Sequence, residues 1–128
     1  MATVDNLMKL PGALAAFEFR GSGELLKHKI ADEDVINTSI LDMLAHMCAA
    51  NISIATMQAR GWENVTEMKG FYPVQEFTLV GYDWSVIVSG LAREASKAEG
   101  KEALPPFMGV VVANDAADYE AAYAALEK

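Results

Sequence analysis

Residue types that commonly bind metals or act as nucleophiles are scarce in this chain. It has one cysteine, Cys48, and two histidines, His28 and His46. His46 and Cys48 are two positions apart in a stretch with helical periodicity, which places them about 200° apart around the helix axis. They therefore cannot share one metal ion or form a nucleophile–base pair, and His28 falls on a predicted strand. We expect no metal site and no catalytic residue, with Cys48 acting as a small buried apolar side chain.

Three other groups of residues could support chemistry, and each has a simpler structural explanation. Methionines could offer soft metal ligands, but their helical spacing is more typical of core or interface packing. The run Asp32-Glu33-Asp34 could hold a cation, but a helix start also favours acids. Neither RGSGE nor GYDW has the pattern of a phosphate-binding loop. We expect no cofactor.

Composition and charge favour a soluble globular domain. Apolar residues make up 52% of the 128 residues, and 18 acids against 10 bases give a net charge of −8. This sign disfavours contact with phosphate backbones and anionic lipid, so we expect neither nucleic acid nor membrane as a partner. The first residues do not resemble a signal peptide, and no apolar run reaches the roughly 18 residues that a membrane span requires. A lone cysteine also fits a reducing compartment. We expect one cytoplasmic domain over residues 1–128.

The first half of the chain predicts a short helix, a hairpin and a long helix. Thr3 can cap a helix over residues 4–10 that Pro11-Gly12 ends. Residues 13–19 and 24–30 alternate in polarity around a Gly-Ser-Gly turn, the pattern of a β-hairpin. A long helix should follow from about Glu33 to Ala59, with Gly61 as its stop.

The second half predicts three strands and a last helix. Val74–Val80 and Trp84–Ser89 read as paired strands, and the apolar run FMGVVVA reads as a central buried strand. Residues 91–106 are polar and end in two prolines, which predicts an exposed excursion with at most a helical turn or two. Asn114 or Asp115 should cap the last helix. The element order predicts an α+β fold with a five-stranded, mainly antiparallel sheet, a long central helix and terminal helices.

The long helix is unusual because almost no charge lies on it. Between Val35 and Ala59 the only formally charged residue is Asp42, whereas a surface helix normally has a charged outer face. Its large apolar residues form two stripes. The first stripe contains Ile36, Ile40, Met43, Met47, Ile54 and Met57, and we expect it to face the sheet. The second contains Leu41, Leu44, Cys48, Ile52 and Ala55, and it needs another cover.

Two covers for the second stripe remain open. The last helix or the 91–106 excursion could supply it within the chain, or a second copy could supply it by antiparallel packing of the two helices. Small residues favour the second copy because they allow helices to approach closely. The candidate dimer contacts are Leu41, Leu44, Ala45, Cys48, Ala49, Ile52 and Thr56.

Several stretches resemble a protein family. MATVDNLMKLPGALAAFEFRGSGELL, MCAANISIATMQARGW and VGYDWSVIVSG are similar to a small uncharacterised bacterial branch of the Roadblock/dynein-light-chain superfamily, and the similarity resumes at FMGVVVANDAADYEAAYAAL. The resemblance implies a profilin-like three-layer sandwich that homodimerises through its central helix and an edge strand. It carries no residue-level site, and the 91–106 excursion departs from the tight turn expected there.

The resemblance and the residues together leave two main functions. The leading hypothesis is a non-catalytic dimeric scaffold or regulatory adaptor that binds another protein, for example a small GTPase or a bacterial metabolic complex. The alternative is a small-molecule sensor, because related folds hold ligands between sheet and helices. A hollow lined by the methionines would support the sensor. No arrangement of residues supports an enzyme.

Overall fold

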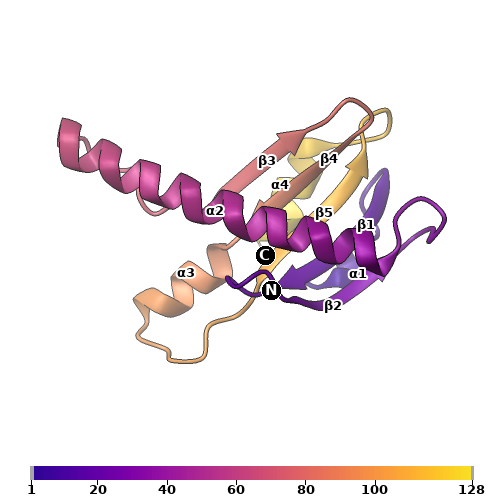
Figure 1. Cartoon of the computed structure of the whole chain (residues 1–128), viewed down its shortest axis with the longest axis horizontal. Helices are drawn as coiled ribbons and strands as arrows, with labels where there is room; N and C mark the ends of the chain where they lie inside the picture. The colour runs from indigo at the N-terminus through magenta and orange to yellow at the C-terminus, as the bar shows by residue number, and fades with distance from the viewer. Residues whose placement is uncertain (1, 128) are drawn as a thin grey trace.

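The computed structural model describes residues 2–127 and contains one five-stranded sheet with helices on both faces (Figure 1). In chain order the elements are α1 (Val4–Leu7), β1 (Ala13–Phe19), β2 (Leu25–Ile30), α2 (Thr38–Thr66), β3 (Glu76–Val80), β4 (Trp84–Ser89), α3 (Leu91–Ala98), β5 (Phe107–Ala113) and α4 (Tyr119–Glu127). The strand order is β2-β1-β5-β4-β3, and all neighbours are antiparallel. The predicted α+β sandwich with a long central helix is confirmed.

β5 is the central strand, as FMGVVVA predicted. It pairs with β1 on one side and β4 on the other, and Phe107 to Val112 are all buried. Gly109 allows the ring of Phe17 to lie directly on the β5 backbone. A Cβ atom there would come within 2.6 Å of Phe17 Cζ. The middle of the sheet is therefore packed on both faces and along both edges of β5.

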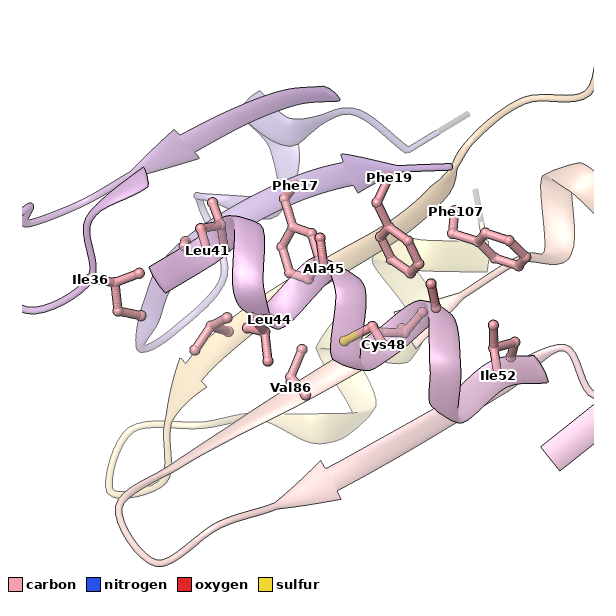
Figure 2. Packing of buried hydrophobic residues seen from close by; sticks show 14 residues of the cluster. Phe17, Phe19, Ile36, Leu41, Leu44, Ala45, Cys48, Ile52, Val86 and Phe107 are labelled. Carbon is pink, nitrogen blue, oxygen red and sulfur yellow. The ribbon is translucent and has the colours of Figure 1, made fainter. Parts of the chain in front are cut away.

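Two apolar layers hold the sandwich together, one on each face of the sheet. The layer under α2 contains Phe17 and Phe19 of β1, Phe107 of β5 and Val86 of β4 (Figure 2). Phe19 stacks between the other two phenylalanines, with ring centroids 5.6 Å and 5.3 Å apart. The opposite layer joins the sheet to α1 and α4. Strand residues alternate between the two layers, as half-buried strands do.

α2 begins later and ends later than the sequence predicted. Asp32 to Ile36 form a turn, in which Asp32 Oδ1 accepts the Asp34 amide at 2.9 Å. The helix is instead capped by Asn37, whose Oδ1 accepts the Ile40 amide at 2.9 Å. The three acids thus precede the cap, and they do not form the first helical turn. Gly61 does not stop the helix, because a helix interior tolerates glycine at a modest cost. Glu67 ends it, with a φ of 59°.

The segments before and after β5 also differ in part from expectation. The 91–106 excursion contains the eight-residue α3, where Ser96 is buried and Arg93 lies 4.9 Å from the Phe107 ring centroid. It is therefore partly packed on the domain, although residues 97–103 are exposed. α4 begins at Tyr119, near Asp118 Oδ1, which accepts the Ala121 amide at 3.0 Å. Neither Asn114 nor Asp115 caps it, since the chain makes a turn before the helix.

Candidate protein-interaction surface

The predicted dimer contacts on α2 are in the core of the protomer, so their placement was wrong. Figure 2 shows Leu41, Ala45 and Cys48 among the side chains that pack against the sheet. All the candidates except Thr56 are at most 7% exposed: Leu41, Leu44, Ala45, Cys48, Ala49 and Ile52. Thr56 is half-buried, and its hydroxyl donates to the Ile52 carbonyl at 2.7 Å. The small residues let α2 approach its own sheet, and they do not lie against a second helix.

The stripe predicted to face the sheet is the exposed one. Only its first residue, Ile36, is buried. The remaining side chains are 44% to 72% exposed: Ile40, Met43, Met47, Ile54 and Met57. Ala50 and Ser53 lie between them and are also exposed. A row of long apolar side chains without charge is costly to leave in water, and large exposed patches of this kind are typical of contact surfaces. We call these five residues the α2 outer face.

The two edge strands of the sheet differ in charge, because β2 has exposed lysines and β3 has exposed apolar residues. The β2 edge has Lys27 and Lys29, and charged residues of this kind discourage pairing with another strand. The β3 edge has no charge after Glu76, and Leu79 and Val80 are exposed there. β3 pairs only with β4, so one row of its backbone groups is available for a further strand. This edge is open to pairing in a way that β2 is not.

The turn between β3 and β4 presents aromatic side chains from a rigid loop. Tyr82 is 99% exposed, and Trp84 is 40% exposed. Asn114 holds the turn, because its side-chain amide donates to the Gly81 and Tyr82 carbonyls at 2.9 and 3.2 Å. Its Oδ1 accepts the hydroxyl of Ser85 at 2.6 Å. Asn114 thus orders the turn at the end of the β3 edge. The sequence did not indicate this role, because a position shortly before a helix predicts a cap.

The last two turns of α2 extend past the sheet and hold a loop against themselves (Figure 1). Ala59 is the last buried residue of the helix. Glu63 Oε2 accepts the backbone amides of Gly70, Phe71 and Tyr72 at 3.0 to 3.2 Å. The hydrogen bond from Tyr72, followed by those from Gly70 and Phe71, lowers the pKa of the Glu63 carboxyl below its ordinary value. One carboxylate thereby orders three residues of the loop.

Aromatic contacts complete this extension. Arg60 donates to the Tyr72 hydroxyl at 2.7 Å and lies over its ring. Trp62 meets Phe71 edge to face, with centroids 6.4 Å apart. Trp62, Val65, Met68 and Phe71 nevertheless remain 49% to 84% exposed. We call residues 60–71 the α2 arm.

The residues that could do chemistry are not brought together. Cys48 is fully buried, and burial raises the pKa of its thiol to about 12, so it stays protonated and unreactive. The Nδ1 atoms of His28 and His46 each donate to a backbone carbonyl of their own element at 2.8 Å. Within residues 2–127 no three His, Cys, Asp or Glu side chains are grouped so as to hold a metal ion. Among the described residues, the geometry offers surfaces for contact.

One hollow lies on the other side of the sheet. It has a volume of about 930 Å³, and α3, the end of α4 and the segment before β3 line it. Ser89 and Met108 lie at its base. Met108 is the methionine among its lining residues, whereas Met43, Met47 and Met57 of α2 are exposed on the outer face.

Solved structures with the same arrangement define the class of fold. The chain is similar to the gliding protein MglB from Thermus thermophilus, with a TM-score of 0.66 and 18% identity over 95% of this chain and 76% of that one. A Roadblock/LC7 domain from Streptomyces avermitilis gives a TM-score of 0.67 at 11% identity, covering 95% of this chain and 82% of that one. A structure described as MglB with tetrameric arrangement gives a TM-score of 0.67 at 18% identity, covering 95% of this chain and 75% of that one. The fold is therefore Roadblock/LC7-like, as the sequence resemblance implied.

The family itself is defined by sequence. Residues 3–98 match the model of a family described as "Uncharacterized conserved protein (DUF2173)", and the chain belongs to that family. No curated protein is significantly similar to it in sequence. By length and composition α2 could cross a membrane, but one such helix is weak evidence. In this fold α2 is the central helix that packs on the sheet.

Proposed function

We propose that this protein is a non-catalytic regulatory adaptor of the cytoplasm, which forms a homodimer through α2 and the β3 edge and binds another protein. The observation that supports this proposal most strongly is the α2 outer face. Five large apolar side chains lie exposed in a row on the central helix of a Roadblock/LC7-like domain. The open β3 edge, with Leu79 and Val80 exposed along it, adds a second surface for the same contact.

The outer face is self-complementary when two copies of α2 run antiparallel. One register pairs Ile40 with Met57 and Met43 with Ile54 across a two-fold axis. The same register places Met47 against the small, exposed Ala50 of the other helix. Every residue of the outer face then meets an apolar partner. The two-fold axis would cross α2 midway along this register, at the level of residues 48 and 49, and would pass through the outer face.

The adaptor role needs a second protein, and the resemblance to the Roadblock superfamily favours a small GTPase or a metabolic complex. The test is affinity capture from native extract with the immobilised protein as bait. Nucleotide bound to GTPases in the extract is first exchanged for a non-hydrolysable GTP analogue or for GDP. We expect one GTPase to be retained in a nucleotide-dependent manner by the wild type and lost with Met47→Arg, because the dimer forms the binding surface. Ala124→Arg, on the exposed side of α4, is the matched control and should retain it. Capture that is independent of nucleotide would favour a metabolic complex, and no specific capture would contradict the adaptor role.

A small-molecule sensor is the second candidate, and the 930 Å³ hollow behind α3 favours it. The volume falls within the range of small-ligand sites, and buried Ser89 offers a hydroxyl at its base. A shift in thermal unfolding on adding one member of a metabolite panel would favour this role. The adaptor is the stronger proposal, because Ser89 and Ser96 are the only buried polar residues among those that line the hollow.

A further inference from the structure

Two methionines and a histidine form one exposed group on α2. Met43 and Met47 are 67% and 49% exposed, and the side chain of His46 is 54% exposed. Residues three and four positions apart on a helix have Cβ atoms about 5–6 Å apart, so His46 and Met47 both lie beside Met43. The three side chains span about 100° around the helix axis. Two thioether sulfurs and one imidazole can therefore reach a common point on the solvent side of α2.

The ring of His46 is oriented so that one nitrogen is left for a ligand. Its Nδ1 donates to the Asp42 carbonyl at 2.8 Å, and the Asp42 carboxylate lies 3.9 Å from the same nitrogen. In the neutral ring the proton is therefore on Nδ1, and Nε2 keeps its lone pair. Gly23 lies against the ring, because a Cβ atom there would come within 2.6 Å of His46 Cδ2. Histidines that bind metals are typically held in this way, through a carbonyl or carboxylate on the other nitrogen.

The three donors favour a soft metal ion. Thioether sulfur selects Cu(I), and imidazole nitrogen also suits copper. Magnesium and calcium prefer oxygen ligands, and zinc sites are usually built from thiolate, imidazole and carboxylate. Because thioether and imidazole are neutral, a bound ion keeps its positive charge. Asp42 beside His46 and the net charge of −8 both favour a cation at this place.

The other soft donors of α2 do not form such a group. Met57 is 72% exposed on the same face, but its helix neighbours at positions 53, 54, 60 and 61 are serine, isoleucine, arginine and glycine. Cys48 is fully buried among the residues that pack on the sheet. Met57 therefore offers a matched comparison, with the same side chain and the same helix face but without a second soft donor beside it.

We propose that Met43, His46 and Met47 form a binding site for Cu(I) on each protomer, through two thioether sulfurs and His46 Nε2. The site goes beyond the adaptor function and needs no second chain. Met43 and Met47 also belong to the α2 outer face, so Cu(I) and a second copy of the chain would use the same side chains. Such coupling is reciprocal. Cu(I) should therefore weaken the dimer, and dimer formation should weaken Cu(I) binding.

Competition with bicinchoninate, which forms a coloured complex with Cu(I), measures the dissociation constant for Cu(I) under anaerobic, reducing conditions. The variants are Met43→Leu, Met47→Leu and His46→Gln, and leucine removes the sulfur while keeping the apolar surface. Each should bind Cu(I) at least about 10-fold more weakly than the wild type, since losing even a residue that supports a metal ligand typically costs that much. Met57→Leu is the matched control and should bind Cu(I) as the wild type does. Equal dissociation constants for Met43→Leu and Met57→Leu would overturn the site.

A second measurement distinguishes the site from the buried thiol without a substitution in the core. X-ray absorption of the Cu(I)-loaded wild type should show two sulfurs and one nitrogen around copper. A single sulfur would assign Cu(I) to Cys48 and overturn the site, and the adaptor proposal would stand because it needs no metal.

Light scattering with and without one equivalent of Cu(I) tests the competition. Cu(I) should shift the wild type towards the monomer, and unchanged self-association of the loaded protein would overturn the competition. A wild type that is monomeric without Cu(I) would remove the dimer, whereas the predicted pattern of Cu(I) affinities would still support the site.

Discussion

The two apolar faces of α2 have similar hydrophobicity and opposite environments. The inner face is made of leucine, alanine, cysteine and one isoleucine, and it is fully packed on Phe17, Phe19 and Val86. The outer face is made of isoleucine and methionine and is roughly half exposed or more. On the inner face, the small residues Ala45, Cys48 and Ala49 let the helix axis approach the sheet. Long, flexible methionines suit a surface that is buried later by a partner.

The largest expected effect is on the inner face. Ala49 is 5% exposed, so Ala49→Arg would place an unpaired charge between α2 and the sheet. We expect it to lower the free energy of unfolding of the protomer by about 3–5 kcal/mol. Urea unfolding followed by circular dichroism measures this, with Ala124→Arg as the control on an exposed helix position. A stable Ala49→Arg protomer that merely fails to dimerise would mean that the two faces have been assigned the wrong way round.

An arginine introduced on the outer face should weaken dimer formation without changing the stability of the protomer. Met47 is 49% exposed and lies near the centre of the proposed contact. Met47→Arg should leave the circular dichroism spectrum of the protomer unchanged and weaken self-association on the order of 100-fold or more, because a buried unpaired charge costs several kcal/mol. Light scattering across a dilution series gives the mass. An unchanged dimer would place the contact elsewhere on the domain.

A smaller effect is expected in the α2 arm. The pKa of Glu63 is lowered because the folded loop donates three amide hydrogen bonds to the carboxylate. A lowered pKa stabilises the loop at pH values above the ordinary value of 4.5, and this stabilisation is lost as the pH falls through the folded-state pKa. Glu63→Gln should therefore speed amide exchange at Gly70 to Tyr72 at neutral pH and leave β5 unchanged. Equal exchange in both proteins would show that the carboxylate does not order the loop.

Most of the fold could be predicted from the sequence, because its signals are local. Alternation identified β1 and β2, the turn at Gly81-Tyr82-Asp83 separated β3 from β4, and the unbroken apolar run of β5 indicated its central place. The boundaries of α2 were missed for a physical reason. Acidic residues at 32–34 indicated an early start, but Asn37 supplies the cap, and Gly61 is compatible with a helix whose end is held by the loop that follows it.

The sequence predicted an apolar contact surface on α2, but it did not predict which residues form that surface. Low charge on α2 indicated that both faces must be covered, yet periodicity gives only the angle between two stripes. It does not state which stripe meets the sheet. The clue available was size, because Ala45 and Ala49 fit a close approach to either a sheet or a second helix. Phe17 and Phe19, which fill the space under α2, decide the choice, and their position depends on strand pairing across the whole domain.

Disulfide trapping across α2 tests the central claim most directly. In the proposed register, Met43→Cys of one chain faces Ile54→Cys of the other, whereas within one helix these positions are about 16 Å apart and cannot form a disulfide. Cys48 is buried and should not interfere. We predict that the double-cysteine protein gives a covalent dimer of twice 13.8 kDa on mild oxidation, while Met43→Cys alone does not. Cross-linking by Met43→Cys alone, or none by the double variant at concentrations where light scattering detects a dimer, would contradict the antiparallel pairing of the α2 outer faces.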